Sequence, residues 1–389
     1  MACCEALGQI SEEDGKLTRT FASPAMRRAN EFVGRCLRQA GFATRQDAAF
    51  NLIGRWNCRL PGAKTFLLGS HLDTVRDAGK YDGPLGVFVA IAAAQLLRQR
   101  GGQLPFHLEI VGFSDEEGVR YQTAYLGSGA FAGTLTSANL DHIEEKHIVR
   151  ARRERGEFLG YAEVHIEQGP VLEKHRLPVG VVTAIAGQSR LRVEYRGVAG
   201  HAGTVPMNVR RDALAGAAEF ILLVEQLAKK RPGLVATVGK IEAAPGASNV
   251  IPSDVALTLD VRSQNDSRRL AAVKWLHAKA GSIARQRGLQ LRWLPVQDTP
   301  AIPCDKRLTR IFSECVARNG RSVLRLPSGA GHDAVAISAM CPVAMLFVRC
   351  RKGISHNPAE SVATADVRVA IEVLADFLQT MAKGELNKL

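Results

Sequence analysis

The sequence predicts an α/β protein: a catalytic domain, with a central mixed, largely parallel sheet flanked by helices, is interrupted by an inserted α+β domain. Three observations predict this organisation. In the first half, apolar strands alternate with longer helical patterns, as in helices packed on a parallel sheet. Near residue 180 the order becomes strand-helix-strand-strand-helix-strand, which is typical of a compact α+β unit. The 389 residues also exceed the length of most single cores. We expect residues 1–186 and 299–389 in the catalytic domain and 187–298 in the insertion.

The individual elements follow from runs of β-branched residues and from helical periodicity. In the first half we predict strands over 51–56, 65–70, 107–113 and 162–166 and helices over 85–99 and 128–132. Around the insertion we predict strands over 181–186, 190–196, 234–241, 255–261 and 289–294 and helices over 210–229 and 267–287. The segments 311–319, 334–340, 343–348 and 367–382 then resume the first pattern.

The composition is that of an ordinary globular protein, with 46% hydrophobic and 23% charged residues. The N-terminus lacks a basic start followed by an apolar run, and no segment approaches the length of a membrane span. We therefore expect a cytoplasmic protein without membrane contact. Its eight cysteines are scattered without a C-x-x-C pair, which argues against a disulfide framework and predicts free thiols.

The net charge of +13 raises the alternative of a nucleic-acid-binding protein. However, lysine and arginine are spread along the chain without interleaved aromatic residues, and the one dense basic run, 150–155, fits a solvated helix face. We expect no nucleic-acid partner. A basic balance also suits an enzyme that attracts a small anion.

Polar residues with metal-binding chemistry follow the predicted strands of the first half. His71 comes directly after the strand 65–70, with Asp73 placed to hold its other ring nitrogen. Asp82 precedes a turn and a helix start, where it fits a helix cap as well as a metal ligand. After the strand 107–113 come three consecutive acids ending in Glu116 and Glu117, which repel one another unless cations offset their charge. One glutamate can bind metal while its neighbour polarises water.

Two further histidines complete the pattern. His165 lies at the end of the strand 162–166, and His356 follows the strand 343–348. Polar residues at the close of apolar strands point into the crevice where open α/β sheets bind ligands. Three histidines and two acids in such positions predict a site for Zn, Mn, Co or Ni.

On these motifs the chain resembles the dinuclear metallohydrolases that include aminoacylases and carboxypeptidases, and within them the amidase/hydantoinase/carbamoylase branch. The resemblance covers roughly residues 8–385. His165, in the run 165–170, is typical of this branch, because peptidase relatives carry a carboxylate ligand there. The resemblance implies two divalent ions per subunit, with manganese expected and zinc, cobalt or nickel as alternatives. It implies Glu116 as the general base and, as metal ligands, His71, Asp82 in a bridging position, Glu117, His165 and His356.

For the inserted domain, the resemblance implies a lid that also forms a homodimer. His201, in the run 197–207, would reach the active site of the partner subunit and stabilise the oxyanion of the tetrahedral intermediate. Arg262 would bind the substrate carboxylate bidentately, and Gln188 and Asn249 would also grip the substrate, although both fit strand-edge and turn positions as well. Gly329 and Ala330 match a loop that lines the substrate end, and we expect the nearby His332 to support the site without binding metal.

Within this branch, the segments 77–83, 114–121 and 345–356 most resemble the allantoate amidohydrolases. That implies a small anionic ureido substrate, allantoate, hydrolysed to ureidoglycine, ammonia and carbon dioxide in purine breakdown. N-carbamoyl-L-amino acid hydrolases and ureidoglycolate or β-ureidopropionate amidohydrolases share the metal site and remain alternatives. A binding protein without activity is disfavoured, because Glu116 and all five ligands are retained.

Overall fold

A computed structural model describes residues 1–383, so the last six residues of the predicted catalytic domain lie outside the described part. The chain divides into two compact units, Met1–Thr183 with Cys304–Leu389, and Ala184–Pro303. The expected insertion, 187–298, lies within the second unit: β7 begins at Gly187, and β12 continues to Thr299. The predicted fold class, a mixed and largely parallel sheet with helices plus a separate smaller α+β unit, is confirmed.

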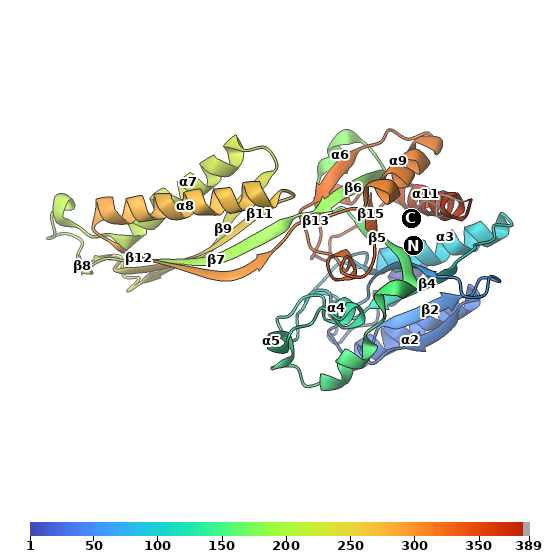
Figure 1. Cartoon of the computed structure of the whole chain (residues 1–389). Coiled ribbons are helices and arrows are strands. Elements are labelled where there is room, and N and C mark those ends of the chain that lie inside the picture. Colours follow the sequence, from blue (N-terminus) through green and yellow to red (C-terminus); the bar gives the residue numbers. More distant parts are fainter. Residues whose placement is uncertain (384–389) are drawn as a thin grey trace. The chain divides into compact units, whose positions relative to one another are not determined.

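The large sheet has four parallel strands at its centre and antiparallel strands on both sides. Its order is β1-β2-β4-β3-β5-β15-β6-β13, with β14 paired to β6 (Figure 1). The strands β4, β3, β5 and β15 run parallel to their neighbours. The bounds are β1 (Ala43–Gln46), β2 (Leu52–Trp56), β3 (Thr65–His71), β4 (His107–Phe113), β5 (Phe158–Ile166), β6 (Val179–Ile185), β13 (Ile302–Pro303), β14 (Arg325–Ser328) and β15 (Val343–Val348).

Helices bury the central strands, and every residue of β3 and β15 is buried. The helix α3 packs against both the sheet and α11, so most of its residues are buried. It begins with Pro84 at its first position, where the ring fits the helix and no N–H is lost. The helices of this unit are α1 (Ala2–Leu7), α2 (Pro24–Gln39), α3 (Pro84–Gln99), α4 (Leu126–Ala132), α5 (Ser137–Leu140), α6 (Val171–His175), α9 (Lys306–Arg318), α10 (Ala334–Ile337) and α11 (Thr364–Ala382), with short 3₁₀ turns at Lys146–Ala151, Arg155–Glu157 and Arg351–Gly353.

The inserted unit is an antiparallel sheet of order β12-β7-β11-β9 with two helices on one face (Figure 1). Along β7, buried and accessible residues alternate, so one side of the strand faces the helices and the other is polar. Asp212 and Asn265 cap the two helices by accepting backbone hydrogen bonds. The bounds are β7 (Gly187–Arg196), β8 (Gly200–His201), a 3₁₀ turn at Met207–Val209, α7 (Ala213–Lys230), β9 (Leu234–Ala244), β10 (Val250–Ile251), β11 (Asp254–Ser263), α8 (Asp266–Arg287) and β12 (Gln290–Thr299).

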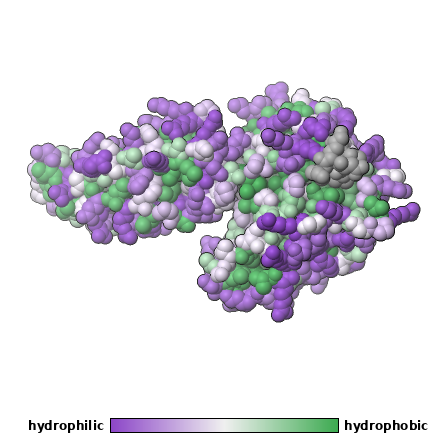
Figure 2. Space-filling view, viewed as in Figure 1, coloured by the Kyte–Doolittle hydropathy of each residue, from purple (hydrophilic) through white to green (hydrophobic). Residues whose placement is uncertain are grey.

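Two further predictions concern the thiols and the membrane. All eight cysteines are free thiols, and five of them are buried, as expected. Among residues 1–383, no helix is both long enough and apolar enough to cross a membrane. On the visible face of the inserted unit, Figure 2 shows apolar residues interspersed with hydrophilic ones.

Candidate functional site

The predicted metal ligands meet at one edge of the large sheet. His71 ends β3, His165 lies near the end of β5, and Glu117 follows β4. Because these strands are parallel to one another, their carboxyl ends lie at the same edge, which β15 and the following His356 also reach. The ligand atoms of two groups each lie within 4.8 Å of one another: His71, Asp82 and His165, and Asp82, Glu117 and His356.

Asp82 belongs to both groups, and each of its carboxylate oxygens faces one of them. Its Oδ1 lies 3.2 Å from Nε2 of His165 and 3.8 Å from Nε2 of His71. Its Oδ2 lies 3.2 Å from Nε2 of His356, and that nitrogen is 3.3 Å from Oε1 of Glu117. The buried Oδ1 has no hydrogen-bond partner among the described residues. This arrangement suits a carboxylate that bridges two cations.

The two buried histidines are oriented as metal ligands. Nδ1 of His71 lies 3.1 Å from the backbone oxygen of Asp73, and Nδ1 of His165 lies 2.9 Å from that of Ile166. A carbonyl oxygen can only accept, so each Nδ1 carries a hydrogen and the Nε2 of the neutral ring presents a lone pair. The two Nε2 atoms are 3.5 Å apart. Two facing lone pairs are unfavourable unless a cation or a proton lies between them, so this donor set fits a metal ion.

The charges of the cluster also require compensation. Burial opposes protonation of His71, but the nearby carboxylate of Asp73 and the charges of Glu116 and Asp82 outweigh it and raise its pKa well above the ordinary value. Hydrogen bonds to Asp82 and Glu117 raise the pKa of His356 to about 10. Burial opposes ionisation of Asp82, yet the histidines hold its pKa well below the usual range. The cluster therefore attracts positive charge, for which protons and metal ions compete.

Asp73 organises the acidic turn more directly than it orients His71. Its carboxylate accepts hydrogen bonds from the backbone N–H of Glu116 at 3.0 Å and of Glu117 at 3.2 Å. Its Oδ1 lies 3.6 Å from Nδ1 of His71, which is an ion-pair distance and too long for a hydrogen bond. Asp115 takes a left-handed conformation, with φ of 57°, and thereby turns the chain before the two glutamates.

Glu116 lies beside the candidate ligands in a buried position. Its carboxylate, a ring nitrogen of His71 and the carboxylate of Glu117 contain atoms within 4.8 Å of one another. Burial raises the pKa of Glu116 well above its ordinary value; the charge of His71 opposes this shift, and that of Glu117 adds to it. A carboxylate with a raised pKa is a better proton acceptor, which is the property of a general base.

Three residues around Asp82 were not among the predicted site residues. Gln168 donates from Nε2 to Oδ2 of Asp82 at 2.9 Å, and Ser355 donates from Oγ to the same oxygen at 2.7 Å. Glu360 accepts hydrogen bonds from the backbone N–H of Tyr81 and of Asp82. Burial, with the charge of Asp82 adding to it, raises the pKa of Glu360 to about 7. The available signal was proximity in sequence, since all three lie within four residues of a predicted ligand.

His332 and its loop lie behind the ring of His165. The ring centroids are 4.5 Å apart, and Nε2 of His332 is 2.7 Å from Oγ of Ser328. Burial, together with the charge of His165, lowers the pKa of His332 well below the ordinary value, so it is neutral. In the same loop Gly329 is exposed, and the N–H of Ala330 donates to Oγ of Ser328 at 3.2 Å.

The predicted substrate residues of the inserted unit form two pairs. Gln188 and Arg262 are register partners on β7 and β11, and the buried Oε1 of Gln188 has no hydrogen-bond partner among the described residues. Arg262 forms a two-pronged contact with Asp260, with Nε and Nη2 each 2.8 Å from a carboxylate oxygen. The exposed His201 accepts a hydrogen bond at Nδ1 from the N–H of Gly203 at 3.0 Å, so its neutral ring carries a hydrogen on Nε2.

These pairs lie at opposite ends of the small sheet. His201 and Asn249 are joined by the β8–β10 pairing and by a hydrogen bond from the N–H of Ala202 to the backbone oxygen of Asn249. Figure 1 shows β8 beyond the end of the sheet where β7 finishes. Gln188 lies at the other end, and the eight steps along the strand from residue 188 to residue 196 span about 26 Å at roughly 3.3 Å per residue. Within one inserted unit, the structure does not bring the two pairs together.

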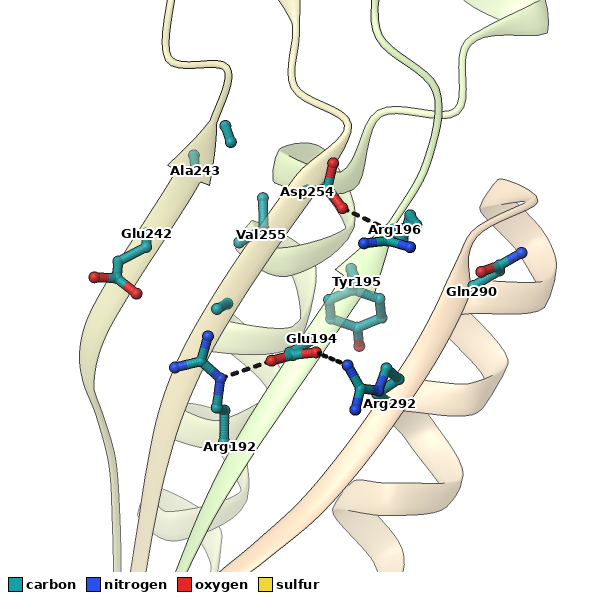
Figure 3. Close-up of a pocket in the computed structure, with 12 residues that line it drawn as sticks. Arg192, Glu194, Tyr195, Arg196, Glu242, Ala243, Asp254, Val255, Gln290 and Arg292 are labelled. Carbon is teal, nitrogen blue, oxygen red and sulfur yellow. Dashed lines mark hydrogen bonds and ion pairs between the residues drawn. The ribbon is translucent and has the colours of Figure 1, made fainter.

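The polar face of the small sheet contains a cavity of about 430 Å³ (Figure 3). Three arginines line it, but acidic neighbours compensate their charges. Glu194 lies 2.7 Å from Nε of Arg192 and 3.1 Å from Nη1 of Arg292, and Asp254 lies 2.7 Å from Nε of Arg196. None of the predicted site residues lines this cavity.

Comparison with known proteins gives concordant similarities. The pattern of Peptidase family M20/M25/M40 matches residues 67–380. Allantoate deiminase 2 of Glycine max is 40% identical over 423 residues, covering 97% of this chain and 88% of that protein. An N-carbamoyl-L-amino acid amidohydrolase of Geobacillus stearothermophilus is 36% identical over 396 residues, covering 97% of both. The crystal structure of a hydantoinase/carbamoylase family amidase from Burkholderia multivorans matches with a TM-score of 0.91 at 29% identity, covering 98% of this chain and 96% of that one.

Proposed function

Because the chain belongs to Peptidase family M20/M25/M40, we propose that it hydrolyses the ureido C–N bond of allantoate, giving ureidoglycine, ammonia and carbon dioxide. The 40% identity with an allantoate deiminase over nearly the whole chain supports this substrate. The observation that carries the chemistry is the convergence of four other candidate ligands, His71, His165, Glu117 and His356, around the carboxylate of Asp82, with Glu116 beside them.

We propose two divalent ions, held by His71, His165 and Asp82 on one side and by Asp82, Glu117 and His356 on the other. The mixed imidazole and carboxylate donors fit manganese, and they also fit zinc, cobalt or nickel. When bound, two such cations lower the pKa of a water between them and polarise the carbonyl to be attacked. The facing Nε2 atoms and the unpartnered oxygen of Asp82 support this assignment.

Glu116 then moves the proton. It accepts a proton from the attacking water and delivers it to the leaving nitrogen, which departs as uncharged ammonia. The carbamate that remains on the other nitrogen then takes up a proton and loses carbon dioxide, which gives ureidoglycine. Asp73 keeps the base in place through the backbone of the acidic turn. His332 packs behind His165 and fixes the plane of that ring.

The inserted unit supplies the groups that recognise the substrate. Arg262 binds its carboxylate bidentately, and Asp260 presents the guanidinium in a fixed plane beforehand. Gln188 and Asn249 bind ureido groups, and the Nε2–H of His201 stabilises the developing oxyanion. The loop at Gly329 and Ala330 lines the other end of the substrate.

We also propose a homodimer, joined through the inserted unit, which closes over the substrate as a lid. A separation of about 26 Å between Gln188 and the His201 end exceeds the length of a small ureido acid. The Gln188–Arg262 pair and the His201–Asn249 pair of one chain therefore cannot contact the same substrate molecule. A partner subunit can supply the second pair. The edge strand β9, with exposed Val235 and Ile241, offers unpaired backbone and apolar surface for that contact.

Mixed dimers test this arrangement. Glu116→Gln and His201→Ala chains should each be inactive alone, yet co-expressed they should regain about a quarter of wild-type activity, because a mixed dimer of two-fold symmetry contains one intact site. No recovery in a purified mixed dimer would contradict the shared site, and a monomer in sedimentation would contradict the dimer.

The substrate is tested by ammonia release, in the presence of Mn²⁺, from a panel containing allantoate, ureidoglycolate, β-ureidopropionate and N-carbamoyl-L-amino acids. Allantoate should rank among the best by kcat/KM. A clear preference for N-carbamoyl-L-amino acids would instead favour the second candidate function, which the 36% identical amidohydrolase supports.

We place the enzyme in the cytoplasm. The support is its eight free cysteines, since a reducing compartment keeps thiols unpaired. Subcellular fractionation with a compartment marker would test this, and recovery with secreted proteins would contradict it.

A further inference from the structure

The buried carboxylate of Glu360 contacts Asp82 by two routes. Its Oε1 accepts hydrogen bonds from the backbone N–H of Tyr81 at 2.8 Å and of Asp82 at 3.1 Å. Its Oε2 lies 3.1 Å from the hydroxyl of Ser355, which is 2.7 Å from Oδ2 of Asp82. Glu360 therefore holds both the main chain and the side chain of the candidate bridging residue.

The packing around Glu360 leaves little freedom on either side. A Cβ atom at Gly79 would overlap the Glu360 carboxyl, so the loop before Asp82 lies directly on this side chain. On the other side, the N–H of Glu360 donates to the backbone oxygen of Asn357 at 3.0 Å, which closes a turn immediately after His356. The short segment 355–360 thus carries His356, Ser355 and Glu360 together against one loop.

We propose that Glu360 is a positioning residue that fixes Asp82 relative to His356 and thereby sets the geometry of the cation those two residues share. This inference rests on the proposed dinuclear metal site. Asp82 and His356 lie far apart in the sequence. A cation requires its ligands at fixed separations, so the structure must hold these two residues in place relative to one another. Partners that orient metal ligands typically contribute about 10- to 100-fold to metal affinity or activity. Loss of Glu360 should weaken the Asp82–Glu117–His356 ion more than the ion held by His71 and His165.

Manganese binding gives a readout that does not depend on turnover. The full-length protein, stripped with a chelator, is titrated with MnCl₂ while free Mn²⁺ is followed by electron paramagnetic resonance. Glu360→Ala should weaken one of the two binding sites by about tenfold or more. Glu360→Gln should stay within a few-fold of wild type, because its amide oxygen can accept both backbone hydrogen bonds and its NH₂ can donate to Ser355. Activity of Glu360→Ala should recover at high Mn²⁺, with KM little changed.

The matched control is Asp305→Ala. Asp305 also accepts two backbone hydrogen bonds, from the N–H of Arg307 and of Leu308 at the start of α9, and is not in either ligand group. This variant loses a similar number of hydrogen bonds and should bind Mn²⁺ as wild type does. A second route to the same perturbation is Gly79→Ala, which keeps the glutamate but displaces it, and should reproduce the Glu360→Ala result.

Wild-type Mn²⁺ affinity at both sites in Glu360→Ala would overturn the positioning role while leaving the dinuclear site intact. If Glu360→Ala does not fold, Gly79→Ala decides, and wild-type binding in that variant overturns the proposal. Equal weakening in Asp305→Ala also overturns it, because the effect would then be general destabilisation. A wild-type protein that takes up no divalent cation would overturn the proposed function and this inference together.

Discussion

Replacing Glu116 by glutamine separates proton transfer from metal binding. The two side chains have nearly the same size, and the hydrogen bond that anchors residue 116 to Asp73 comes from the main chain, so the substitution leaves that anchor in place. An amide cannot take up the proton that the attacking water must lose. General acid–base groups contribute about 10²- to 10⁴-fold, and this base serves both water attack and nitrogen departure, so we expect kcat to fall by about 10³-fold or more. That corresponds to about 4 kcal/mol of transition-state stabilisation.

The structure makes metal content the decisive second measurement. Glu116 lies within 4.8 Å of candidate ligand atoms of His71 and Glu117, so its carboxylate is close enough to be a ligand as well as a base. If it acts as the base alone, Glu116→Gln retains two metal ions per chain by mass spectrometry after gel filtration, while ammonia release collapses. Loss of one ion would make Glu116 a ligand, and wild-type kcat would remove it from the mechanism.

Asp115→Asn is the control from the same acidic run. The Asp115 carboxyl is buried without a hydrogen-bond partner among the described residues, and burial raises its pKa well above the ordinary value. Asparagine has nearly the same size and shape as this side chain and tolerates the left-handed backbone conformation at this position. We expect this variant to keep both metal content and turnover, so that a loss confined to position 116 reflects its chemistry.

Three more outcomes are expected. Neighbouring carboxylates raise the pKa of His356 to about 10, so metal binding below that pH displaces the proton of this histidine. Calorimetry should therefore find that Mn²⁺ affinity rises with pH, by up to tenfold per pH unit for each proton displaced. An affinity that does not depend on pH would contradict this. Arg262→Lys should raise KM for the anionic substrate by about 10- to 100-fold, because a charged hydrogen bond worth about 1.5–3 kcal/mol is lost. An equal rise in KM for a neutral ureide would refute a contact between Arg262 and the substrate carboxylate. Gly86→Ala should lower Tm by several degrees in thermal unfolding, because the added Cβ would overlap the carbonyl oxygen of Val164. Such overpacking costs about 1–3 kcal/mol. The control is Gly156→Ala, which has open space around it and should leave Tm unchanged.

The central strands and the positions of the candidate ligands were predictable because both depend on short local patterns. The segments 107–113 and 343–348 are apolar runs with clear ends, and the structure gives β4 and β15 these same bounds. The helix α2 was absent from the predicted elements, although Ser23 as a cap and Pro24 at the first position are start signals. Polar residues that directly follow buried parallel strands lie at one edge of the sheet, so the candidate ligands come close together.

The residues that hold those ligands were harder to predict, because their direction depends on backbone conformation. Gln168 and His356 have φ values of 55° and 54°, a left-handed conformation that no local pattern signals at non-glycine residues. The separation of Gln188 from His201 also depends on the strand register, which places the two residues at opposite ends of a sheet. The family resemblance, and not a local pattern, is what assigned His201 to the site of the partner subunit.

The two halves of the large unit are separated in sequence by the inserted one, and this has a consequence for biosynthesis. During translation the inserted residues 184–303 leave the ribosome before β15 and His356 exist, so that unit can fold while the unit around it still lacks a central strand. His356, a candidate ligand, lies in the segment that is synthesised after the insertion. A chain that stopped before residue 343 would therefore contain the whole inserted unit but would lack β15 and His356, so the candidate metal site would be incomplete.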